Sequence, residues 1–147
     1  MRIERGKKIN LKELNEDLYL EVDTDVYPID KDATINVYGI LTAEDNVTIN
    51  GSVECSEALF GKDCHVKGTV ITGGIKTGSG FKARHIEAGE QADIGSDSHV
   101  NKIDAVNDIT IGDNSRVRHA ISERGKIVLV GRAVADIAEA AQGTQKA

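Results

Sequence analysis

Four histidines are the first side chains in this sequence that could do chemistry, because a neutral imidazole is a common metal ligand and general base. They are His65, His85, His99 and His119. Their spacing follows a 17-residue repeat, in which His65 shares one phase with His99, two repeats away, and His85 shares another with His119. Such positions lie roughly 10 Å apart in stacked strands, too far for one metal ion with ligands at about 2 Å. We expect solvated surface positions, with a zinc site only where neighbouring chains share ligands.

The remaining reactive side chains form no recognisable catalytic arrangement. Cys55 and Cys64 are too few for a disulfide scaffold and have no partners at zinc spacing. Cys64 has the phase of an inward residue, which predicts a buried thiol. The glycine-rich stretch 73–80 has the residue order of neither a phosphate loop nor a nucleophile elbow. We therefore expect no catalytic residue, no cofactor and no metal.

The 17-residue repeat predicts a tight corner in every copy. One column at this interval holds only residue types that readily adopt the left-handed backbone region. Its members are Asn46, Asp63, Gly80, Asp97, Asn114 and Gly131. A second column contains glycine four times in succession, at Gly61, Gly78, Gly95 and Gly112.

Apolar columns between the corners predict the strands. One inward ladder is Ile49, Val66, Ala83, Val100, Val117 and Val134. Two others, Leu41, Ala58, Ile75, Ala92, Ile109 and Ala43, Phe60, Thr77, Ile94, Ile111, Val128, flank a more polar column. This alternation with period two is typical of a β-strand. A third strand is less regular, which suggests a bulge or a local slip of register. Ile35, Ile86, Ile103 and Ile137 share one phase, and Val53, Val70 and Ile121 lie one residue later.

Short strands that repeat at a constant interval indicate an all-β, single-domain β-solenoid. We expect about six coils of the 17-residue repeat with three short strands each, over residues 35–137. Residues 1–34 form a charged N-terminal segment with a first strand or cap, and residues 138–147 a disordered tail. A β-sandwich or an up-and-down barrel is the alternative, but neither needs a constant period.

Charge and hydropathy limit the classes of partner. The 147 residues carry 18 Lys and Arg against 24 Asp and Glu, a net charge of −6, which argues against a specific nucleic-acid binder. The longest apolar run, Ile127–Val130, is far below the roughly 18 residues of a membrane span, and no signal-peptide pattern opens the chain. We expect a cytoplasmic protein without a small-molecule substrate.

Basic side chains nevertheless gather at outward phases of one strip. The candidate face for an anionic partner consists of Lys67, Lys82, Arg84, Lys102, Arg116 and Arg118. It would suit an anionic membrane surface reached by the polymer, a polyanion, or the acidic face of another protein copy. A solvated ladder of long side chains is the alternative.

The C-terminal repeat breaks the alternation, which predicts strands covered on both sides. A solenoid end also presents unpaired backbone groups that must be capped or joined. Since no amphipathic helix follows, we expect joining between copies of the chain. The candidate polymer interface is Ile127, Val128, Leu129 and Val130 at one end, with Leu18, Leu20 and Val22 at the other.

The coil sequences resemble the bactofilins, the polymer-forming cytoskeletal proteins of bacteria. The resemblance covers about residues 35–137 and depends on runs such as 47–53, 58–70 and 109–117. It implies a right-handed β-helix that polymerises end to end without nucleotide and serves as a structural scaffold.

The Ile111–Ser115 turn also resembles those of the hexapeptide-repeat acyltransferases. That resemblance implies a left-handed β-helix trimer with catalysis or metal binding at the chain interface. Those proteins keep a strict six-residue beat, three beats to a coil, and the 17-residue interval of this chain breaks that beat in every coil.

Overall fold

Each coil turns at a corner where the backbone enters the left-handed region. The computed structural model describes all 147 residues, and the six residues of the predicted corner column have φ between 54° and 74°. Gly6 and Asp23 continue the corner toward the N-terminus, with φ of 71° and 65°. The predicted corners are therefore confirmed, and the same corner is already present in the first two coils, at Gly6 and Asp23.

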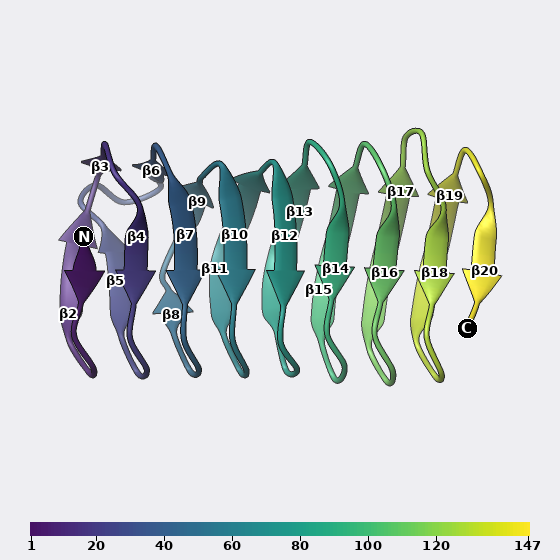
Figure 1. Cartoon of the computed structure of the whole chain (residues 1–147), viewed down its shortest axis with the longest axis horizontal. Helices are drawn as coiled ribbons and strands as arrows, with labels where there is room; N and C mark the ends of the chain where they lie inside the picture. Colours follow the sequence, from purple (N-terminus) through teal and green to yellow (C-terminus); the bar gives the residue numbers. More distant parts are fainter.

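The first face of the solenoid is a parallel sheet of nine strands, one from each successive coil (Figure 1). In axial order they are β1 (Arg2–Ile3), β4 (Leu18–Leu20), β7 (Ile40–Ala43), β10 (Glu57–Phe60), β12 (Gly74–Thr77), β14 (Ala92–Ile94), β16 (Ile109–Ile111), β18 (Ile127–Leu129) and β20 (Thr144–Lys146). Eight coils are complete, and β20 begins a ninth.

The second and third faces share an eleven-stranded parallel sheet. In the early coils the two faces use separate strands: β2 (Lys8–Leu11), β5 (Asp25–Pro28) and β8 (Thr48–Ile49) on the second face, and β3 (Glu13–Leu14), β6 (Thr34–Val37) and β9 (Ser52–Glu54) on the third. From the fourth coil one long strand spans both faces: β11 (His65–Thr72), β13 (Lys82–Ala88), β15 (His99–Ala105), β17 (Arg116–Ser122) and β19 (Val134–Ala140). The start of β11 pairs with β8 and its end with β9, so the long strands bend between the faces.

The fold class is the one that the repeat predicted. All elements are strands and all pairings are parallel. The register keeps the predicted repeat interval in most coils, for example between Leu41 and Ala58 and between Ala58 and Ile75. The predicted bulge is present, because the register between β11 and β13 changes between Val66 and Thr69.

The solenoid extends beyond the predicted 35–137 core at both ends, and it has more than six coils. Residues 1–34 belong to the first two coils, whose last strand, β6, ends at Val37. Leu18 pairs with Leu41 rather than with Ile35, the residue one regular period later. Most of the extra residues form the loop 29–33 between β5 and β6, and one more lies between β6 and β7. These insertions hide the 17-residue period in the sequence. Residues 138–147 are not a disordered tail, because they complete β19 and form β20, which pairs with β18. The polar sequence of β20 carries no apolar pattern that could have revealed it.

The inward positions of the last two coils differ from those predicted. The loop 123–126 is one residue longer than its counterpart 106–108, so β18 pairs with β16 one position later than the regular period predicts. Leu129, rather than Val128, therefore stacks inside on Ile111. Ala135, rather than Val134, stacks on Val117, and Val134 is 48% exposed.

The inward assignments of Ile121 and Ile137 were also wrong. Ile121 pairs with the outward Asp104, and Ile137 is exposed. The register change between β11 and β13 moves Ile121 off the inward column, and the added residue before β18 does the same to Ile137. A constant period describes neither change.

The interior is one continuous column of small apolar side chains. A single cluster of 35 buried residues runs from Ile3 to Ala133. Its largest members are Phe60 and Phe81, whose ring centroids lie 5.0 Å apart, and Phe81 is fully buried. Because the rod is filled by stacked Ile, Val, Leu and Ala, each coil depends mainly on the coils directly above and below it.

Deletion of one complete period tests whether the coil is the structural unit. Ile94 pairs with Ile111, so removal of residues 95–111 rejoins equivalent positions and should leave a folded β-rich protein that unfolds cooperatively. Removal of residues 95–102 should instead place every later column on the wrong face and unfold the C-terminal coils. Circular dichroism and thermal unfolding distinguish the two variants. Equal behaviour of both deletions would contradict the assignment.

Gly112 tests the close approach of the corners. A Cβ at this position would lie 2.5 Å from the carbonyl carbon of Gly95 and 2.7 Å from the backbone nitrogen of Ser96. We expect Gly112→Ala to push two coils apart and to lower the free energy of unfolding by about 1–3 kcal/mol. Gly89→Ala is the control, because its nearest neighbour would be 3.8 Å away. The control should be neutral or stabilising by about 0.4–1 kcal/mol, as measured by denaturant titration.

Candidate functional site

Five of the six predicted cations lie together on the second face. Lys82 and Arg116 share one outward row with His65 and His99, through the pairings of β11, β13, β15 and β17. Lys67, Arg84 and Arg118 form the second outward row, each directly after an inward residue of its strand. All five cationic side chains are exposed. We call Lys67, Lys82, Arg84, Arg116 and Arg118 the cationic face.

Most of the cationic face is not neutralised by the protein itself. Arg116 forms an ion pair with Asp136 at 3.0 Å. Lys67, Lys82, Arg84 and Arg118 form no ion pair with any carboxylate of the chain. Burial lowers the pKa of His65, and the nearby charges of Lys67 and Lys82 lower it further. The second face is therefore locally electropositive on a chain of net charge −6.

Lys102 does not join this face. It lies beyond the bend of β15, in the row between His85 and His119, and its Nζ is 3.8 Å from Asp104. His85 Nε2 is 2.8 Å from the same carboxylate, and His119 Nε2 is 3.6 Å from Glu139. The charges at the bend thus offset one another. The prediction placed Lys102 with the free cations because it ignored the change of face within the strand.

The histidine columns are confirmed. Lys82 separates His65 from His99 in the ladder, and Lys102 separates His85 from His119. No three side chains of His, Cys, Asp or Glu lie close enough to hold a metal ion within one chain. His85 and His119 instead lie near carboxylates of the following coil.

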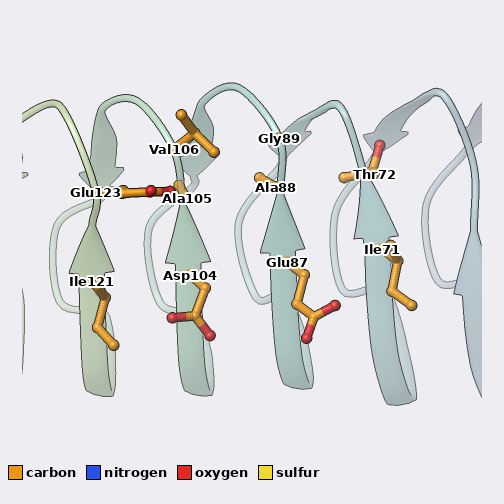
Figure 2. A pocket seen from close by; sticks show the side chains of 10 residues that line it. All are labelled: Ile71, Thr72, Glu87, Ala88, Gly89, Asp104, Ala105, Val106, Ile121 and Glu123. Atoms are coloured by element: carbon orange, nitrogen blue, oxygen red, sulfur yellow. The ribbon is translucent and has the colours of Figure 1, made fainter.

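A depression that the sequence analysis did not identify lies on the third face. It has a volume of about 550 Å³ and crosses β11, β13, β15 and β17. Figure 2 shows its outer row, in which Ile71, Glu87, Asp104 and Ile121 follow one another on consecutive strands. The floor of the depression is formed by two buried alanines of β13 and β15. It is therefore an open surface groove in which two neighbouring carboxylates, Glu87 and Asp104, lie between two isoleucines.

A second depression of about 450 Å³ lies at the N-terminal end of the cationic face. Three cations from different coils line it: Lys31, Lys67 and Arg84. A smaller one of about 170 Å³ follows at Arg116 and Arg118. Only the second has a wall built by the loop 29–33, and we call it the loop groove.

Four of the seven predicted polymer-interface residues lie inside the solenoid, and none of the seven lies on an open strand edge. Leu18, Leu20, Ile127 and Leu129 are buried, while Val22, Val128 and Val130 are half-buried. β18 is covered by β20, and β4 by β1. The open edges at the ends therefore belong to β19 and β20 at the C-terminus and to β1, β2 and β3 at the N-terminus. The sequence analysis did not predict these edges because it did not recognise the outermost coils.

Both cysteines are buried in the core. Burial raises the pKa of the Cys55 thiol to about 11, against a weaker opposing hydrogen bond with Thr72, and burial also raises the pKa of Cys64. The Sγ atom of Cys64 donates to the carbonyl oxygen of Glu44 at 3.1 Å. Neither environment produces a thiolate nucleophile.

Comparison of the chain with protein-family models, with curated proteins and with solved structures found no match. No helix in the structure has the length and apolar character that crossing a membrane requires.

The thiols provide a direct test of the packed interior. A pKa raised from 9.0 to about 11 lowers the thiolate fraction of Cys55 near neutral pH roughly 100-fold. We expect both cysteines to react with a disulfide reagent much more slowly in the native protein than in denaturant. Reaction of native Cys55 at the denatured rate would contradict its position in the core. The absorbance of the released thiol measures both rates.

Proposed function

We propose that this protein is a non-enzymatic structural scaffold whose chains assemble end to end into filaments without nucleotide. The observation that carries the proposal is that one interior column becomes exposed at the C-terminal end of the solenoid. The column consists of Val53, Val70, Ile86, Ile103 and Ala120, followed by Ala138. All five of these side chains are buried, but the next member, Ala138, is exposed although it stacks on Ala120. The interior of the solenoid thus opens to solvent at its C-terminal end.

Backbone groups at this end also lack partners. β19 pairs only with β17, and β20 only with β18. A parallel strand edge presents alternating N–H and C=O groups that can accept another strand. Natural sheets protect such edges with helices, prolines or inward-facing charges. In β19 the inward positions hold only the alanines Ala135, Ala138 and Ala140, so this edge carries no inward-facing charge. In β20, Thr144 and Lys146 stack on the inward Ile127 and Leu129, so only this short strand has an inward-facing charge.

The N-terminal end has a similar open edge. β1 pairs only with β4, β2 only with β5, and β3 only with β6. Inward residues at this end are less covered than those one coil further in. Ile9 is half-buried, whereas its neighbour in the column, Val26, is 1% exposed. Both ends of the rod therefore offer the surface that another coil would bury (Figure 1).

The resemblance of the coil sequences to bactofilins supports the same function. Apolar burial and edge pairing would drive assembly, and neither requires a cofactor. The partner that we propose is a second copy of this chain, bound through the outer coils rather than through Ile127 and Leu129. Charged substitutions at those two residues would destabilise the core of the single chain, so they would not test a contact between chains.

Charged residues at the open inward positions test the assembly. In a single chain Ala135 is only partly covered and Ala138 is exposed, so Ala135→Glu and Ala138→Glu should leave the fold intact. In a filament the next coil would bury these charges without a partner. We expect the double variant to remain in the supernatant on high-speed centrifugation and to show no filaments by negative-stain microscopy.

Leu59→Glu is the matched control. Leu59 is 44% exposed on β10, a strand paired on both sides, and its substitution should leave filaments unchanged. Circular dichroism verifies that all variants are folded. Filaments that persist in the folded double variant, or a wild-type protein that stays monomeric at high concentration, would overturn the proposal.

A further inference from the structure

The loop groove occurs where the chain departs most from its repeat. In the third coil Gly51 is followed directly by Ser52, whereas in the second coil the equivalent Pro28 and Thr34 are separated by residues 29–33. The inserted loop leaves the stacked surface and forms one wall of the groove. Insertions in solenoids lie on one face and commonly form binding surfaces.

Three cations converge on this groove from three coils. Lys31 lies on the inserted loop, Lys67 on β11 and Arg84 on β13. None forms an ion pair within the chain. The only carboxylate that lines the groove is Asp32. The groove therefore retains an excess of positive charge on an acidic protein, and this charge has no internal counterion.

The floor of the groove includes two glycines. Gly51 and Gly68 line it without side chains, and the Gly68 N–H donates to the carbonyl oxygen of Gly51. The N–H of Gly51 donates to no acceptor in the protein, although the residue is half-buried. An anion in the groove could accept this hydrogen bond together with those of the cationic side chains.

We propose that the loop groove binds a condensed phosphate, a ligand with two or more linked phosphate groups. The inference does not depend on the proposed filament function. Arginine and lysine together match phosphate oxygens, the first through its planar fork and the second as a point charge. The volume of about 450 Å³ exceeds that needed for one phosphate ion and falls in the range of small-ligand sites.

The chemistry favours phosphate groups over nucleobases as the feature that is recognised. Single-stranded nucleic acids bind through aromatic side chains that stack on successive bases. The row of Lys67 and Arg84 has one aromatic side chain, Tyr27, two coils from Lys67, and none lies between the cations. The groove can thus neutralise charge but offers no platform for bases.

Calorimetric titration with inorganic pyrophosphate at low salt tests the proposal. We expect binding that is at least 10-fold weaker in Lys67→Gln and in Arg84→Gln. Lys82→Gln and Arg118→Gln remove the same charge from the same face but lie outside the groove, and they should change the affinity less than twofold. Equal losses in all four variants would show diffuse attraction by the face and overturn the site.

Deletion of residues 29–33 tests the wall separately from the charge on the strands. It joins Pro28 to Thr34 as Gly51 is joined to Ser52, so the coil should fold while pyrophosphate binding is lost. A folded deletion variant with wild-type affinity would overturn the proposal, as would a wild-type protein that does not bind pyrophosphate.

Two further ligands identify what the groove recognises. Inorganic phosphate should bind at least 10-fold more weakly than pyrophosphate, because it reaches fewer of the three cations. ADP with affinity similar to that of pyrophosphate would support recognition of the diphosphate alone. Binding of ADP or of single-stranded RNA without binding of pyrophosphate would contradict it. Vesicles that carry a diphosphorylated lipid headgroup would reveal whether a membrane can supply the same group.

Discussion

The stacking of one coil on the next is the constraint on which the rest of this structure depends. Parallel strands about 4.8 Å apart satisfy their N–H and C=O groups only with the coils above and below. Backbone hydrogen bonds such as those from His65 N–H to Val47 and from Lys82 N–H to Cys64 follow this pattern. Each coil must therefore present its strands at the same height and angle as its neighbours, and the corners must repeat.

This constraint converts sequence positions into rows of like environment. Gly78, Gly95 and Gly112 stack so closely that a Cβ on any of them would meet backbone of the preceding coil. The same geometry aligns Lys82 with Arg116 on the second face and Glu87 with Asp104 on the third. A row of exposed charged side chains does not by itself indicate a binding partner, because water can solvate each of them. What distinguishes the cationic face is that its five exposed cations occupy two adjacent rows and only Arg116 among them forms an ion pair.

The two candidate binding surfaces of this rod lie where the stacking of coils is interrupted. At the two ends the interruption is complete, since Ala138 and Ile9 have a neighbouring coil on one side only. At the loop 29–33 it is local, since the strands of the coil stay in register while the inserted residues leave the surface. The first case exposes apolar interior and strand edges, which suits another copy of the chain. The second creates a concave site with uncompensated charge, which suits a small anion.

The sequence by itself determined the fold class, the corners and most interior columns, because a constant period requires equivalent residues at equivalent positions. The left-handed corner residues and the buried ladder from Ile49 to Val117 could be identified in this way. So could the bulge before Val70, since a bulge shifts a column by one residue and leaves a visible trace.

Only the tertiary structure decided where the repeat begins and ends and which cations share a surface. Coils with insertions, or with polar strands such as β20, are held by hydrogen bonds to neighbours rather than by their own apolar pattern. One added residue before β18 turned Val134 outward and Ala135 inward, because a strand alternates its side chains with period two. Lys102 left the cationic face and Lys31 joined the groove for a related reason: bends and loops place residues by three-dimensional contact, which a linear period does not record.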